Sequence, residues 1–167
     1  MPGRSRTARK RPEVFDGAEA VLAALTAYPG RIAEAARRLG EKRLDYKPLS
    51  EDWSARENLA HLRACADVWG TGIARMLGED NPAWRYVSPR GYLHKTNYLT
   101  LGFGESFAAF AAQRDELLKT LLALSPSGWS RAATINGKQE TVLAYADRIA
   151  SHEGLHVEQI EELLGSA

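Results

Sequence analysis

The segment Trp53–Leu77, WSARENLAHLRACADVWGTGIARML, decides the fold class of this chain. It opens with Ser54 and, three residues later, Glu57, the capping-box pattern in which each side chain binds a free backbone N–H at a helix start. Apolar residues then recur at the three- and four-residue spacing of an amphipathic helix: Leu59, Leu62, Cys65, Ala66, Trp69, Ile73 and Met76. The segment therefore predicts one long helix that buries a single face and ends at Gly78.

A second helical pattern covers residues 14–39, where apolar side chains recur at the same spacing. Pro29 and Gly30 interrupt this pattern. Proline fits the first turn of a helix, but in the middle it removes a hydrogen bond and clashes with the preceding turn. We therefore expect a short extra N-terminal helix that ends near Ala27 and a longer helix that begins near Pro29.

Two further long helices are predicted in the C-terminal half, over residues 105–124 and 140–164. The connection 78–103 is rich in proline, glycine and aromatic residues, and so long a connection in a small domain is either functional or a crossover between helices. Asn136-Gly137 is a tight-turn pair between two short runs that can form a minimal hairpin. Four long amphipathic helices with no convincing sheet indicate an all-α four-helix bundle.

Length and composition fit one globular domain. The chain has 167 residues, of which 44% are hydrophobic and 26% charged, as is ordinary for a soluble protein with a single core. No apolar run approaches the ~20 residues of a membrane span, and the N-terminus lacks the apolar segment of a secretory signal. The single cysteine, Cys65, cannot form an internal disulfide, which favours a cytoplasmic location.

Charge is distributed unevenly along the chain. Five of the 22 basic residues lie in residues 1–12, which contain no acidic residue, so residues 13–167 carry 17 basic against 21 acidic side chains. We interpret residues 1–12 as a disordered basic leader and residues 13–167 as the bundle domain. A basic tail can contact nucleic acid, but the body has no basic stripe with interleaved aromatic residues, so nucleic-acid binding is not expected.

Three histidines are the first candidates for chemistry. His152 and His156 are four residues apart, so they project from one face of the last predicted helix and can bind a single metal ion. His61 lies two turns into its own predicted helix, beside the apolar stripe. Three imidazoles around one ion leave open coordination positions, as in a catalytic site. The alternative is three separate histidines, each with an ordinary hydrogen-bond partner.

Two motifs resemble those of the DinB/YfiT superfamily. The run WSARENLAHL at 53–62 is similar to the family pattern WSxxExxxHL, and SHEGLHVEQI at 151–160 is similar to its HxxxHxxQI. Residues of the preceding loop also resemble the family's loop: Trp129, Asn136-Gly137 and Thr141-Val142. The order and spacing of these motifs are intact over residues 32–164.

The resemblance implies a four-helix bundle with a long crossover connection, often a homodimer, and a site for a divalent transition metal, most often zinc or nickel. Carried over to this chain, the ligands are His61, His152 and His156. Relatives include S-transferases that use a low-molecular-weight thiol, so the resemblance implies a metal-dependent thiol transferase that acts on a small molecule. The alternatives are a metal-dependent hydrolase and a non-catalytic metal-binding bundle with a stress-response role.

Four side chains beside the histidines have more than one interpretation. Cys65 is a fourth ligand, a reactive thiol or, most often for a lone helical cysteine, a small buried hydrophobe. Gln159 either reaches back towards the site or lines the core. Glu153 follows a ligand directly and points about 100° away from it, so we expect it at the surface rather than behind the ligand. Glu57 is expected to serve mainly as the helix cap.

The aromatic connector is the expected wall of a substrate pocket. Its candidate wall residues are Trp84, Tyr86, Arg90, Tyr92 and Tyr98. They either enclose an open metal position, where they would bind something planar or anionic, or pack over helix ends or at a dimer contact. His94 is expected to be exposed, unless this connector folds over the metal and the imidazole carries protons.

Overall fold

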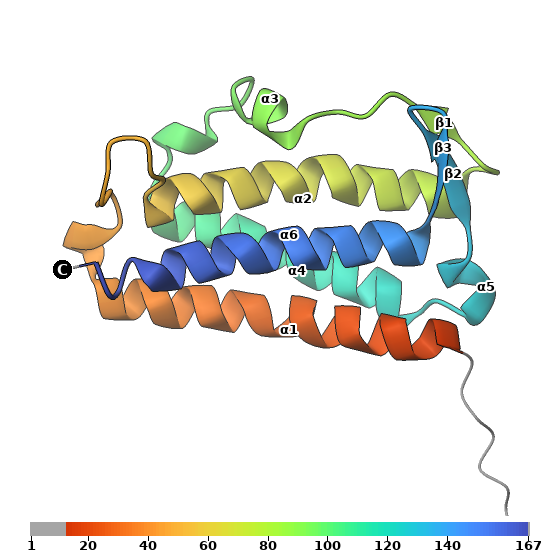
Figure 1. The fold of residues 1–167 in the computed structure, drawn as a ribbon, viewed down its shortest axis with the longest axis horizontal. Helices are drawn as coiled ribbons and strands as arrows, with labels where there is room; N and C mark the ends of the chain where they lie inside the picture. The colour runs from red at the N-terminus through yellow and green to blue at the C-terminus, as the bar shows by residue number, and fades with distance from the viewer. Residues whose placement is uncertain (1–12, 167) are drawn as a thin grey trace, which may run out of the picture.

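The computed structural model describes residues 13–166, so the basic leader predicted over residues 1–12 lies outside the described residues. Four long helices lie side by side and form the body of the molecule (Figure 1). They are α1 (Glu13–Leu39), α2 (Ala55–Gly78), α4 (Phe103–Leu122) and α6 (Val142–Glu162). The predicted four-helix bundle is confirmed. No helix in the described part of the chain is long and apolar enough to cross a membrane.

The break predicted at Pro29 is wrong, because α1 continues through this residue as one helix. Leu25 and Ile32, on either side of the proline, are both fully buried. A proline inside a helix costs about 3 kcal/mol, and the continuous apolar face of α1 packed on α6 offsets that cost. The short extra N-terminal helix is therefore the first part of α1.

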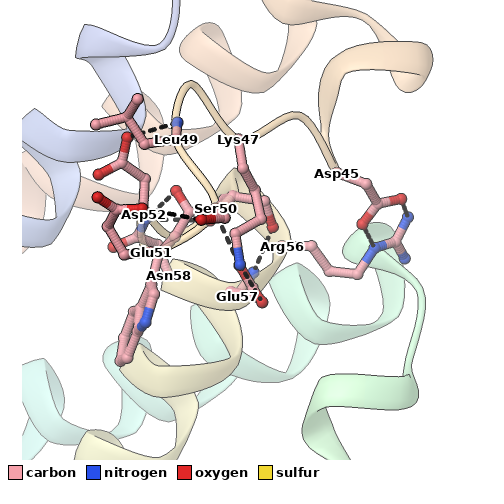
Figure 2. A network of polar contacts seen from close by, with 11 residues as sticks. Asp45, Lys47, Leu49, Ser50, Glu51, Asp52, Arg56, Glu57 and Asn58 are labelled. Atoms are coloured by element: carbon pink, nitrogen blue, oxygen red, sulfur yellow. Dashed lines mark hydrogen bonds and ion pairs between the residues drawn. The ribbon is translucent and has the colours of Figure 1, made fainter.

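The start of α2 confirms the capping box. The Ser54 hydroxyl accepts a hydrogen bond from the Glu57 backbone N–H at 3.2 Å, and the Glu57 carboxylate accepts one from the Ser54 backbone N–H at 2.8 Å. Glu57 also pairs with Lys47 at 3.2 Å, while Arg56 pairs with Asp45 across the same connector (Figure 2). These contacts fix the segment that leads into α2 and with it the first turns of the helix.

The long connection between α2 and α4 contains three short elements. They are β1 (Ala83–Trp84), α3 (Pro89–Leu93) and the 3-10 turn η2 (Tyr98–Thr100). Another 3-10 turn, η1 (Glu41–Arg43), precedes α2. The connection runs back along α2, with α3 lying against that helix (Figure 1). The crossover interpretation of this segment is therefore confirmed.

A small sheet covers the end of the bundle where α6 begins (Figure 1). The expected hairpin forms from β2 (Ala132–Ile135) and β3 (Lys138–Thr141), joined by Asn136 and Gly137 with φ of 50° and 79°. Positive φ at both central residues is the requirement of the favoured two-residue hairpin turn. Strand β1 pairs with β2 in parallel, a contact that the sequence analysis missed. The short helix α5 (Pro126–Trp129) precedes the hairpin.

Two apolar clusters fill most of the bundle core. The cluster nearer the sheet contains Trp69 and Ile149, and the other contains Leu59 and Ile160. Along α6, His152 and His156 fall between the residues of these two clusters, and along α2 His61 lies next to Leu62, the last α2 residue of the second cluster. A polar group of side chains therefore interrupts the apolar core at one level of the bundle.

Candidate metal centre

The structure brings His61, from α2, together with His152 and His156, from α6. The Nε2 atom of His152 lies 3.0 Å from Nε2 of His61 and 3.1 Å from Nε2 of His156. One ligand atom from each residue lies within 4.8 Å of the other two. The i,i+4 spacing on α6 and the packing of α2 on α6 produce this arrangement.

The three nitrogen atoms suit a divalent transition metal. Ligand nitrogens bound tetrahedrally at 2.0–2.1 Å from an ion lie about 3.3 Å apart, close to the separations seen here. Zinc, nickel, copper and iron all accept imidazole ligands. Three protein ligands leave a further coordination position, which distinguishes a catalytic from a structural metal site.

The tautomer of His156 is set by two neighbours. Its Nδ1 atom lies 2.8 Å from Oδ1 of Asn58 and 2.9 Å from Oε1 of Gln159. Both oxygens only accept, so Nδ1 carries the proton and donates, which leaves the lone pair of Nε2 free for a metal. The Asn58 amide nitrogen in turn donates to the Ser54 carbonyl at 3.0 Å, which orients Oδ1 towards His156. Of the two interpretations of Gln159, the reach towards the site is the one observed.

Asn58 is a functional candidate that the sequence analysis missed. It is 1% exposed, although it lies on a helix whose buried face is otherwise mostly apolar. A buried amide three residues before His61 was the available signal, because such a group must find a partner inside the core.

The electrostatics of the site keep the imidazoles neutral. Burial, and then the neighbouring imidazoles, lowers the pKa of His61 from 6.5 to about 3. Burial likewise lowers the pKa of His156 to about 4 and lowers that of His152. Nδ1 of His61 is also buried without a hydrogen-bond partner. Neutral imidazoles with free Nε2 lone pairs are the form that binds metal.

Cys65 borders the site without joining the three nitrogen atoms. Its Sγ atom lies 3.4 Å from Nε2 of His61, and the side chain is buried. Burial raises the pKa of its thiol, which keeps the sulfur protonated next to the neutral imidazole. Among the described residues, the group of mutually close ligand atoms comprises the three histidines and excludes this sulfur. The interpretation of Cys65 as a small buried side chain fits this environment best.

Trp53 and Arg90 enclose the histidines on one side. The Trp53 ring lies edge-on to His61 at 5.0 Å and stacked on His156 at 5.7 Å between ring centroids. The Arg90 guanidinium, from α3, lies 4.9 Å above the Trp53 ring. The connector therefore folds towards the site, as one interpretation expected, and of its candidate wall residues Arg90 is the one that lines the cavity. Trp53 was part of the motif, yet its role as a wall depends on tertiary contacts.

A cavity of about 480 Å³ opens beside His156. Its lining combines Trp53 and Arg90 with Asn58 and Gln159, the two residues that bind Nδ1 of His156. Further lining residues are Pro48, Glu51, Asp52, Glu162, Leu163 and Ser166. The polar lining, with carboxylates and one guanidinium, suits a polar small molecule rather than an apolar one.

Five predicted pocket residues lie elsewhere. Tyr86 is exposed, and the Tyr98 hydroxyl donates a hydrogen bond to Asp67 of α2 at 2.6 Å. Trp84 belongs to the sheet, where the Arg75 guanidinium covers its ring at 4.7 Å. Tyr92 packs against α2 and lines a separate groove between α2 and α4. His94 is exposed at the end of α3. None of the five lines the cavity beside His156, because α3 turns Arg90 towards the site instead.

The expected surface position of Glu153 is wrong. Glu153 is 3% exposed and forms a two-pronged ion pair with Arg114 of α4, which is 1% exposed. Its Oε1 atom accepts from Nε of Arg114 at 3.2 Å. Burial raises the pKa of Glu153 to about 7, although Arg114 opposes this shift. Glu153 lies about 100° from His152 around α6 and so faces α4. Helical periodicity alone cannot identify which helix a given face of α6 meets.

Comparison with known proteins agrees with this architecture. The solved structure of YfiT from Bacillus subtilis, described as "a probable metal-dependent hydrolase with an unusual four-helix bundle topology", superposes with a TM-score of 0.78 at 16% identity. The match covers 96% of this chain and 91% of that chain, and at this identity it shows the fold alone. No curated protein matches the sequence.

The family comparison covers most of the chain. The model of the DinB superfamily matches residues 13–160, which include α1, α2, α4, all but the last two residues of α6, and the three histidines. The chain therefore belongs to the DinB superfamily.

Proposed function

We propose that this protein binds one divalent transition metal through Nε2 of His61, His152 and His156 and acts as a metal-dependent enzyme on a small molecule. The observation that carries the proposal is the convergence of three neutral imidazole nitrogens beside an open polar cavity. Zinc and nickel are the ions that we propose, in keeping with the family resemblance and the all-nitrogen donor set.

The side chains around the site have separate roles in this proposal. Asn58 and Gln159 hold the imidazole of His156 in the metal-binding tautomer. Trp53 covers the site, and Arg90 binds a polar or anionic part of the substrate in the cavity. A divalent metal bound there supplies a Lewis acid that lowers the pKa of a coordinated thiol or water and so generates a nucleophile at neutral pH.

Thiol transfer is the reaction that we propose first. Its support is the family resemblance and the set of residues within hydrogen-bond distance of the three imidazoles, which in the described part of the chain includes no carboxylate that would serve as a general base. A low-molecular-weight thiol would then be the second substrate. Hydrolysis is the second candidate, because YfiT is described as a probable metal-dependent hydrolase and because Glu51, Asp52 and Glu162 line the same cavity.

The first test is elemental analysis of the purified protein and of two matched variants. His156→Ala removes one proposed ligand, whereas His94→Ala removes an exposed histidine outside the group. We expect a near-stoichiometric transition metal in the wild type and in His94→Ala, and its loss in His156→Ala. Absence of metal from the wild type after incubation with zinc or nickel would refute the proposal.

The second test separates the two reactions. Cobalt-loaded protein is titrated with a small thiol, and the absorption spectrum is followed for a thiolate-to-metal band. The band should appear in the wild type if a thiol is the nucleophile. Metal-loaded protein with no such band but with activity on ester or amide substrates would favour hydrolysis.

We further propose that the protein forms a homodimer and acts in the cytoplasm, both of which stay predictions.

A further inference from the structure

Two tryptophans flank the three histidines, and they differ in their surroundings. Trp69 meets His152 edge-on at 5.0 Å between ring centroids, is 4% exposed and belongs to the buried cluster nearer the sheet. Trp53 contacts the rings of His61 and His156 and is only partly buried. The indole beside His152 is therefore part of the core, whereas the other indole borders a surface that a ligand can reach.

The core side of the histidine group is closed. The Cys65 side chain is buried, and its sulfur lies 3.4 Å from Nε2 of His61. Cys65 and Trp69 belong to the same buried cluster. A ligand that approached His61 from this side would have to displace close-packed core side chains. Approach from the side of Trp53 requires no such rearrangement of the core.

The cavity of about 480 Å³ beside His156 lies on the Trp53 side of the group. Trp53 and His156 both line this cavity, whereas His61 and His152 do not. The Trp53 ring is in edge-on contact with the His61 ring, at 5.0 Å between the two centroids. Because the indole both lines the cavity and contacts His61, it stands between the cavity and that imidazole.

Side-chain contacts, rather than a helix, hold this indole in place. Trp53 precedes Ser54, the N-cap of α2, so its backbone lies outside the helix. The Arg90 guanidinium lies 4.9 Å from the centroid of the Trp53 ring, and the His156 ring stacks on the indole at 5.7 Å. The ring can therefore be displaced without unwinding a turn of α2.

We propose that Trp53 sets the size of the ligand that can reach the metal position from the cavity. This role rests on the proposed function, because it requires a metal ion held by the three histidines. A small donor passes the indole, whereas a bulkier one has to push the ring away from Arg90 and His156. Overpacking of this kind weakens binding about tenfold. Trp53 is thus a specificity-determining residue for the proposed metal centre.

The test uses the full-length protein loaded with divalent cobalt, whose visible absorption bands change when a new ligand joins the metal. Two probes with the same donor atom are titrated, imidazole and the bulkier 1-benzylimidazole. The measured quantity is the dissociation constant of 1-benzylimidazole divided by that of imidazole. We expect this ratio to fall about tenfold from the wild type to Trp53→Ala, because the alanine removes the obstacle. Trp53→Phe, with a smaller ring, should give an intermediate ratio.

Trp84→Ala is the matched control. Trp84 is also a partly buried tryptophan, but it belongs to the sheet and does not line the cavity, so its variant should keep the wild-type ratio. An unchanged ratio in Trp53→Ala would overturn the proposal, because ligands would then reach the metal by another path. A higher ratio would also overturn it, because the indole would then bind the benzyl ring rather than exclude it. So would cobalt-loaded protein that binds neither probe.

Failure of the proposed function gives a different result. A wild type that takes up no cobalt would refute the metal site itself, and the role of Trp53 with it. Elemental analysis of each variant verifies that cobalt is still bound, so that the titration reports access to the metal and not the loss of a ligand. Should Trp53→Ala fail to fold, as judged by circular dichroism, the ratio in Trp53→Phe decides in the same way.

Discussion

Nδ1 of His156 on α6 donates a hydrogen bond to Oδ1 of Asn58 on α2, at 2.8 Å between the two atoms. The contact joins the two helices that carry the three histidines. It also turns Nε2 of His156 towards Nε2 of His152, 3.1 Å away. One amide therefore sets both the tautomer of a proposed ligand and its direction.

Replacing Asn58 with alanine should weaken metal binding about 10- to 100-fold, the usual effect of losing the partner of a ligating histidine. Competition with a coloured chelator measures this affinity. Gln159→Ala removes the other acceptor of the same Nδ1 atom and should have a smaller effect, because Gln159 is more exposed than Asn58. Unchanged affinity in Asn58→Ala would show that the contact does not orient the ligand.

The metal-free protein should lose stability as the pH falls from about 6.5 towards 4. The pKa values of His61 and His156 lie below 6.5 in the folded state, at about 3 and about 4. In this window each of these two imidazoles binds more protons in the unfolded than in the folded chain, and His152 adds to the effect. Glu153, with its pKa raised to about 7, acts in the opposite direction as a single group, so the histidines prevail and the free energy of unfolding decreases as the pH falls. Urea denaturation at a series of pH values measures the slope.

The control for this pH dependence uses single histidine variants. His156→Asn should make the slope shallower by up to about 1.4 kcal/mol per pH unit, the contribution of one proton. His94→Asn changes an exposed histidine and should leave the slope as it is. A slope that is insensitive to His156 would contradict the neutral state assigned to this imidazole.

Breaking the buried pair of Arg114 and Glu153 should destabilise the bundle strongly. Glu153→Ala leaves an unpaired guanidinium that is 1% exposed, so we expect a loss of about 3–5 kcal/mol in the free energy of unfolding. Glu34→Ala, at an exposed pair with Arg37, should cost far less, because solvent screens an exposed ion pair. Replacing both Arg114 and Glu153 with methionine should restore most of the loss, and a double variant as unstable as Glu153→Ala would contradict this account.

Cys65→Ala should keep the metal. Sγ of Cys65 approaches only the His61 member of the group, at 3.4 Å from its Nε2 atom, and burial keeps the thiol protonated. Elemental analysis of Cys65→Ala beside His61→Ala provides the comparison, with metal expected in the first and absent from the second. Loss of metal from Cys65→Ala would instead support a saturated four-ligand site and a non-catalytic role.

Local features of the chain were predicted from the sequence because they depend on residues a few positions apart. The capping box at Ser54 and Glu57 involves one helical turn. The common face of His152 and His156 follows from the helical repeat. The hairpin at Asn136 and Gly137 follows from turn chemistry. Each of these signals is complete within a short segment, so tertiary packing changed none of them.

The tertiary structure alone decided the features that join distant segments. Packing on α6 kept α1 continuous through Pro29, against its local propensity. Arg90 rather than Trp84 lies over Trp53 and lines the cavity beside His156, since the path of the connector across α2 sets which of its side chains points to the site. Glu153 forms an ion pair with Arg114 of α4 inside the core. The sequence by itself determined the helices and the spacing of the candidate ligands. The walls of the site and the buried ion pair beside it depend on which faces of different helices meet. Helical periodicity carries no information on which faces those are.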